Sequence, residues 1–230
     1  MKRWLLIAIA AIAFTGFSAL GIWQIERRAW KLALIERVEQ RVHAAPVATP
    51  GPADWPGLTR ENAEYRHVML TGRWLGGRQT LVRAVTELGE GFWLMEPLQT
   101  DEGFVVLVNR GFVPQGWHDT DATSGTHVAV TGLLRISEPH GAFLRPNDPA
   151  NNRWYSRDVE AISHAQRLTG TAPYFVDAEA ANGTGSEPSQ PPVAGLTVIH
   201  FRNSHLQYVF TWFALALMAL WLGVRVARAR

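Results

Sequence analysis

Two long apolar segments, one near each end of the chain, most constrain how this sequence can fold. Residues 4–25 contain 22 consecutive positions without a charged side chain, and residues 206–224 contain 19. Because a hydrocarbon core of roughly 30 Å is crossed by about 20 helical residues, either segment can span a membrane. The alternatives are a cleaved signal peptide for the first segment and a buried core helix for the second. The first segment ends in the bulky run Gly21-Ile22-Trp23-Gln24, which is unlike a cleavage site and favours a span.

Basic residues predict the orientation of these two spans. Two spans place both termini on one side, and the terminal cations are Lys2, Arg3, Arg225, Arg228 and Arg230. The positive-inside rule then predicts that both termini are cytoplasmic and that the middle domain is outside. Arg27, Arg28 and Lys31 lie just beyond the first span, on the side that the rule disfavours. These three cations therefore need a separate explanation.

Composition excludes several classes of protein. The chain has no cysteine, which excludes disulfides, thiolate metal sites and covalent haem attachment. Its net charge is +2 and no basic run is interleaved with aromatic residues, so we expect no nucleic-acid partner. Glycine-rich nucleotide loops, serine-nucleophile motifs and zinc-protease motifs are absent from the sequence. The closest acidic pair, Asp119 and Asp121, is interpreted as a solvated turn, and we predict that the chain is not an enzyme.

The chain divides into four predicted parts. Residues 1–27 form the cytoplasmic tip and the first transmembrane helix, and residues 204–230 form the second transmembrane helix with a basic cytoplasmic tail. Residues 28–57 form a helical extension of the first span followed by a linker. The linker is predicted because prolines at positions 46, 50, 52 and 56 are incompatible with a helix interior. Residues 58–203 form an extracytoplasmic domain with a mobile loop at about 182–195, which is rich in Gly, Ser, Pro and Asn.

The extracytoplasmic domain reads as α+β with a mostly antiparallel sheet. Apolar and polar residues alternate over 66–74, and residues 104–108 form a continuous β-branched and aromatic run typical of a strand buried on both faces. Further strands are predicted at 80–85, 127–135 and 196–201. One helix is predicted between Ser156, as its cap, and Gly170, with Asp158 and Glu160 in its first turn. The fold class is therefore a membrane-anchored α+β protein.

His205 is the histidine best placed to bind a metal. It follows Ser204, whose spacing to Gln207 matches a capping box, so His205 is predicted to be the first helical residue of the second span. The positive end of the helix dipole favours a neutral imidazole there, which is a good ligand for haem iron. Tyr208 and Trp212 follow on the same helix face.

The end of the first span lies at a matching depth. Trp23 and Arg27 share one helix face, and Arg28 lies beside them. Together the two span ends offer one imidazole, an aromatic slot and guanidinium groups that can bind haem propionates. The alternative is ordinary membrane-surface chemistry, in which Trp and Tyr gather at the interface and Arg and Lys snorkel. The residues alone leave both interpretations open.

Four motifs resemble the surfeit locus protein 1 family, whose members help to assemble cytochrome c oxidase. They occur in the family's order, between the two spans and across them: residues 21–31 (GIWQIERRAWK), 108–114 (VNRGFVP), 146–158 (PNDP followed by NRWYSRD) and 202–213 (RNSHLQYVFTWF). One departure is Ser204, where an acidic residue is expected before the histidine. The resemblance covers nearly the whole chain.

The resemblance implies that the chain is an assembly factor that binds haem a and aids its insertion into the large catalytic subunit of the oxidase. It implies His205 as the axial ligand of the haem iron. The haem a synthesis machinery is a further candidate partner, and membrane lipid surrounds the spans. A cofactor-free scaffold that holds oxidase subunits during assembly is the alternative, and an uncharacterised membrane enzyme is a third hypothesis for which the sequence offers no site.

The beginning of the sequence bears on its location. The first apolar segment begins at Trp4, whereas a mitochondrial relative would carry an amphipathic, arginine-rich extension before it. The sequence therefore predicts a multi-pass protein of the bacterial cell inner membrane with a periplasmic central domain.

Overall fold

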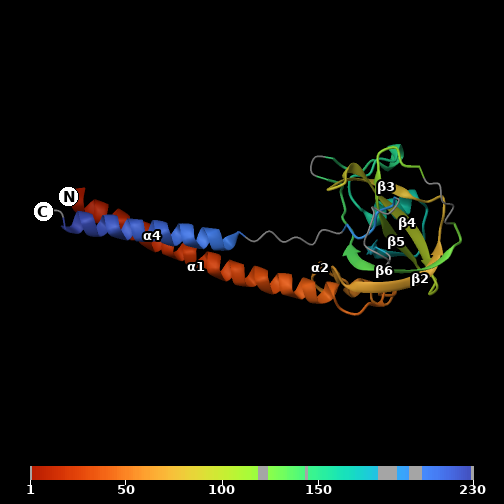
Figure 1. Cartoon of the computed structure of the whole chain (residues 1–230), viewed down its shortest axis with the longest axis horizontal. Coiled ribbons are helices and arrows are strands. Elements are labelled where there is room, and N and C mark those ends of the chain that lie inside the picture. The colour runs from red at the N-terminus through yellow and green to blue at the C-terminus, as the bar shows by residue number, and fades with distance from the viewer. Residues whose placement is uncertain (1, 119–123, 143–144, 181–190, 197–203, 229–230) are drawn as a thin grey trace. The chain divides into compact units, whose positions relative to one another are not determined.

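The chain contains two compact units, each described here by itself. A computed structural model describes residues 2–118, 124–142, 145–180, 191–196 and 204–228 (Figure 1). The first unit comprises residues 1–39 and 199–230, and the second comprises residues 40–198. The predicted loop at 182–195 lies largely outside the described residues, as do most of the predicted strand at 196–201 and the pair Asp119 and Asp121.

The first unit is a pair of apolar helices. Helix α1 (Lys2–Val42) runs without a break beyond the apolar segment, as predicted, and α4 (His205–Arg228) begins at His205. Both helices are long and apolar enough to cross a membrane, judged by length and composition.

Small residues let α1 and α4 approach closely. A Cβ atom added at Gly21 would lie 2.9 Å from the ring of Phe213, and one added at Gly223 would lie 3.1 Å from the Cβ of Ala10. Small residues at such contacts are what helix pairs in membranes use to bring their backbones together.

The second unit is built around one seven-stranded sheet. Its strands are β1 (Val47–Ala48), β2 (His67–Trp74), β3 (Thr80–Thr86), β4 (Gly89–Thr100), β5 (Val105–Pro114), β6 (His127–Ile136) and β7 (Thr171–Ala178). Strand β2 pairs with β6 along most of its length and with β4 at its last residues. Since β6, β7, β5 and β4 pair in succession, these pairings close a ring of five strands, with β1 and β3 attached outside it.

The sheet is mixed, which refines the prediction of a mostly antiparallel one. Among the described strands, β1 pairs with β2 and β5 pairs with β7 in parallel, whereas the other pairings are antiparallel. The β5–β7 pair is parallel because the chain crosses over between these strands through β6 and a helix, α3 (Val159–Ala165).

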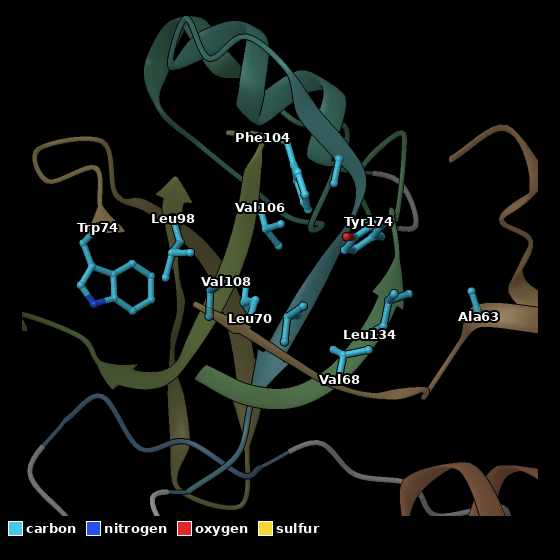
Figure 2. Close-up of a cluster of buried hydrophobic side chains, with 12 residues drawn as sticks. Ala63, Val68, Leu70, Trp74, Leu98, Phe104, Val106, Val108, Leu134 and Tyr174 are labelled. Carbon is cyan, nitrogen blue, oxygen red and sulfur yellow. The ribbon is translucent and has the colours of Figure 1, made fainter. Parts of the chain in front are cut away.

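Two apolar clusters stabilise this unit. The first lies inside the ring and includes Val106, Val108 and Tyr174; Figure 2 shows these side chains among the strands. The second lies between the sheet and α3 and includes Leu107, Phe175 and Ile162. Successive residues of β5 thus enter different cores, so the predicted burial of 104–108 on both faces is confirmed.

Short elements complete the second unit. They are the 3-10 turns η1 (Trp55–Gly57) and η2 (Pro149–Asn151) and the helix α2 (Arg60–Ala63). Helix α3 begins two residues later than predicted, because the side chain of Asp158, not that of Ser156, accepts a hydrogen bond from the Ala161 N–H and caps it. The Ser156 hydroxyl instead receives the Gly141 N–H.

Candidate functional site

The side chain of His205 is held by α1. His205 opens α4, and its Nδ1 lies 2.7 Å from the Oε1 of Gln24 in α1. Gln24 is only 8% exposed although it lies near the end of an apolar segment. The contact therefore joins two polar groups that are 181 residues apart in the sequence and close together in the helix pair.

This hydrogen bond selects one tautomer of the imidazole. An amide oxygen only accepts, so Nδ1 carries the proton and donates it to Gln24. In the neutral ring, the Nε2 atom then keeps its lone pair, which is the state required of a metal ligand. Histidines that bind metals commonly donate their other ring N–H to a fixed acceptor, which orients the ring and raises its basicity. Gln24 provides such an acceptor here.

Two turns further along α4, Trp212 stacks on Phe17 of α1. The two ring centroids are 5.8 Å apart and the rings are inclined by 25°. The indole Nε1 of Trp212 is buried and has no hydrogen-bond partner among the described residues. A buried N–H without an acceptor is costly, so the Trp212 indole is an unfavourable group within the helix pair.

The other predicted site residues are more exposed. Trp23 is 53% exposed and Tyr208 is 50% exposed. The guanidinium of Arg27 lies 4.1 Å from the ring centroid of Trp30, and Arg28 is half-buried. His205 thus contacts the face of α1 that carries Gln24, and not the face of the neighbouring residue Trp23. Contact of the four exposed or half-buried side chains with a ligand stays a prediction.

Sequence reasoning missed Gln24. The available signal was a polar amide at the end of an apolar helix, at the depth of the only histidine of the second span. Choosing Gln24 over Trp23 required the rotation of α1 about its axis relative to α4, and that rotation is set by the packing of Gly21 and Phe17.

One imidazole suits a haem better than a bare metal ion. Among the described residues, no group of three or more His, Asp or Glu side chains could hold a metal ion. A haem iron needs only one or two protein ligands, because the porphyrin supplies the rest. The donor found here, one imidazole with an oriented ring, therefore fits haem.

The cavity within the helix pair lies elsewhere. It measures about 320 Å³ and is lined by Ala10, Ala219 and Gly223 among other small and apolar residues. Ala219 follows His205 by 14 residues, about 21 Å along the helix, so this cavity is not part of the imidazole site.

Buried charges in the second unit are paired with one another. Arg135 of β6 donates to Glu64 at 2.8 Å and to Asp177 of β7 at 2.9 Å, and Arg157 also reaches Asp177. Burial lowers the pKa of Arg135, but the carboxylates of Asp177 and Glu64 more than offset this, and the net pKa is raised. This network links β6 and β7, and its arginines and carboxylates form hydrogen bonds with one another. We therefore interpret it as a contribution to the stability of the fold and not as a binding site.

Comparisons with known proteins identify the family. A sequence profile described as the SURF1 family matches residues 11–217. The chain belongs to the SURF1 family.

The human surfeit locus protein 1 is 35% identical over 235 residues, which cover 93% of this chain and 73% of the human protein. The mouse protein of the same name is 34% identical, with coverages of 98% and 76%. A SURF1-like protein of Monosiga brevicollis is 34% identical, with coverages of 96% and 87%. SURF1 membership supports a role in cytochrome oxidase assembly.

Proposed function

We propose that this SURF1 protein binds haem a at His205 and aids its insertion into the large catalytic subunit of a haem-copper oxidase. The observation that carries the proposal is the hydrogen bond between His205 Nδ1 and Gln24 Oε1, which leaves Nε2 as the metal-binding nitrogen. Family membership supports the assembly role.

The membrane arrangement is part of the proposal. The apolar helices α1 and α4 cross the membrane with both chain ends in the cytoplasm, and the β-rich unit lies on the other side, the periplasm of a bacterial cell. The terminal cations Arg3, Arg225 and Arg228 support this orientation. His205 then lies at the outer surface of the membrane, where haem made within the membrane can pass to a client subunit.

Each site residue has a distinct task. The haem supplies the iron centre that the client oxidase later uses. His205 would hold that iron through Nε2, and Gln24 would keep the proton on Nδ1 and fix the ring. Arg27 and Arg28 offer guanidinium groups to the propionates, which explains cations on the side that the positive-inside rule disfavours. None of these tasks makes or breaks a covalent bond of a substrate, so the protein acts as a carrier and not as an enzyme.

The test is the absorption spectrum of the purified full chain, made in cells that synthesise haem a. The wild-type protein should show a Soret band, and His205→Ala should abolish or strongly alter it. The matched control is His118→Ala, which removes an exposed imidazole of the second unit and should leave the band unchanged. Insertion should survive in both variants, because it depends on the apolar length of the helices.

A full Soret band in a well-folded His205→Ala protein would move the ligand to another residue. A colourless wild-type protein that still co-purifies with the oxidase subunit would instead support the alternative, a cofactor-free scaffold.

A further inference from the structure

The cavity within the helix pair is an open groove between α1 and α4, called here the α1–α4 groove, and its volume is about 320 Å³. Exposed residues of both helices line it, among them Ala11 of α1 and Leu220 of α4, so an occupant can reach its walls. None of the described lining residues is charged. Under the proposed arrangement these helices cross a membrane, and lipid chains surround the groove in place of water.

The α1–α4 groove has the depth of one membrane leaflet. Its α1 wall extends from Ile7 to Thr15, about 12 Å along the helix axis. A leaflet contributes about 15 Å to a hydrocarbon core of roughly 30 Å. Since Thr15 lies near the middle of the apolar segment 4–25, the groove extends from one membrane surface to about the bilayer centre. The acyl chain of a single lipid occupies the same depth.

Two arginines flank the surface end of the groove. Arg3 precedes Ile7 by one helical turn and Arg228 follows Val224 by one turn, so each arginine continues a row of lining residues. The guanidinium of Arg3 donates a hydrogen bond to the carbonyl oxygen of Ala227, which itself lines the groove. The apolar groove therefore ends at two cations.

These two cations have no acidic neighbour in the adjoining sequence. Residues 1–25 and 199–230 contain neither Asp nor Glu. A guanidinium carries several N–H donors in a planar fork that matches a phosphate group, and the donors of Arg228 and the remaining donors of Arg3 can serve such an anion. Arg225 differs, because its guanidinium lies 5.5 Å from the ring centroid of Trp221, a residue that does not line the groove.

We infer that the α1–α4 groove binds one anionic phospholipid, with an acyl chain between the helices and the phosphate on Arg3 and Arg228. A groove within the hydrocarbon depth selects a lipid chain, and the cations at its end select a negatively charged headgroup. This inference rests on the membrane arrangement within the proposed function and not on haem binding. The groove and the imidazole lie at different depths of the helix pair, so the two sites can fail separately.

Native mass spectrometry of the full chain in a mild detergent tests the headgroup. After exposure to phosphatidylglycerol, the wild type should retain one molecule of this lipid, whereas it should lose phosphatidylcholine with the same acyl chains. Arg3→Gln with Arg228→Gln should lower the retention of phosphatidylglycerol by about tenfold, because the phosphate loses both charged partners. Equal retention of the two lipids by the wild type would overturn the inference.

A matched pair of arginines controls for the general charge of the chain ends. Arg228→Gln and Arg225→Gln remove the same charge from the last turn of α4. Only Arg228→Gln should lower the retention of phosphatidylglycerol, because Arg225 lies over Trp221 and away from the groove. Equal losses in the two variants would show that positive charge alone attracts the lipid, and the groove would then have no part in it.

The second test blocks the groove and leaves both cations in place. Ala11→Phe adds a large side chain at an exposed lining residue and should lower the retention of phosphatidylglycerol by a similar factor. Ala8→Phe makes the same substitution at an exposed residue of α1 that does not line the groove, and it should keep the lipid. Equal retention by both phenylalanine variants would overturn the inference. So would a dimer of the chain that excludes the lipid in the same spectra.

Haem binding separates this inference from the proposed function. The groove and arginine variants should keep the Soret band, whereas His205→Ala should lose the band and retain phosphatidylglycerol. A wild-type chain that stays soluble without detergent would contradict the proposed membrane arrangement itself. A membrane-bound wild type that shows no preference for the anionic lipid would contradict only the lipid inference.

Discussion

Gln24 lies on a helix surface where most neighbours are apolar, and its amide has one close polar partner among the contacts described, the ring of His205. A buried amide in an apolar helix costs free energy unless it is hydrogen-bonded. The imidazole gains equally, because the amide oxygen fixes its proton on Nδ1. Each residue thus gives the other a hydrogen-bond partner, and under the proposed function the neutral ring would offer Nε2 to the haem iron.

This relation leads to a prediction for Gln24. Gln24→Leu should weaken haem retention by about tenfold, because loss of an outer-shell partner of a ligating histidine typically costs 10–100-fold in metal affinity. Gln24→Glu keeps an acceptor for Nδ1 and should retain more haem than the leucine variant. Haem titration of the purified chain measures both. Gln207→Leu is the control, because Gln207 is an exposed amide beside His205 in α4.

The two arginines after the first apolar segment allow a second prediction. Charge-assisted hydrogen bonds contribute roughly 1.5–3 kcal/mol each, so Arg27→Ala with Arg28→Ala should weaken haem retention by about tenfold or more. Arg83→Ala with Arg153→Ala removes the same charge from two exposed positions of the second unit and should have no such effect. Unchanged haem occupancy in the first double variant would leave membrane-surface snorkelling as the role of Arg27 and Arg28.

Among the elements, the α1–α4 contact is the one on which the histidine depends. Gly21→Leu should separate the helices, because even a Cβ atom at this position would lie 2.9 Å from the ring of Phe213. Haem retention should fall and the thermal midpoint should drop. Gly16→Leu makes the same substitution in the same helix where no atom lies within 4 Å, and it should be tolerated. If both variants lost haem alike, the loss would not report on the packing of Gly21 against Phe213, because leucine favours a helix more than glycine at either position.

The strands β6 and β7 are joined by buried charges, and a matched pair of arginines tests what they contribute. Arg135→Met leaves Glu64 and Asp177 without this cation and should lower the free energy of unfolding by about 3 kcal/mol. Arg60 pairs with the same Glu64 at 4.0 Å but its side chain is 62% exposed, so Arg60→Met should cost less than about 1 kcal/mol. Denaturant unfolding of the two variants gives the comparison.

Local sequence patterns predicted some strands and not others, and the reasons are physical. The alternation in β2 is visible because one face is buried and the other is exposed, and the prediction of 66–74 is confirmed by His67–Trp74. Strand β4 was missed because Gly91 and Pro97 interrupt it, and such residues normally argue against a strand. Strand β7 was missed because Pro173 and Asp177 look like loop residues.

The Asp177 carboxylate in β7 shows what a local pattern cannot contain. Its buried oxygens accept hydrogen bonds from Asn109, Arg135 and Arg157, which come from distant parts of the chain. The contact between Gln24 and His205 has the same character, since it depends on how two helices from opposite ends of the sequence pack. The sequence singled out His205 as a candidate ligand, and what this histidine binds stays a prediction, whereas its partner Gln24 was not singled out.

At the scale of the whole molecule, the proposal requires the second unit and the two chain ends to lie on opposite sides of a membrane. The chain contains no cysteine, so a single introduced cysteine reports on one position. Leu88→Cys lies in the exposed turn between β3 and β4, and Ala227→Cys lies near the end of α4. Both side chains are exposed in the structure.

We expect a membrane-impermeant maleimide to label Leu88→Cys in cells whose outer barrier alone is opened. Ala227→Cys should react only after the inner membrane is disrupted, because the basic chain ends favour the cytoplasm. Labelling of both positions after disruption shows that each cysteine is reactive. The reverse pattern in intact inner membranes would place the β-rich unit in the cytoplasm, and His205, at the start of α4, would then face the wrong side to deliver haem from the outer surface.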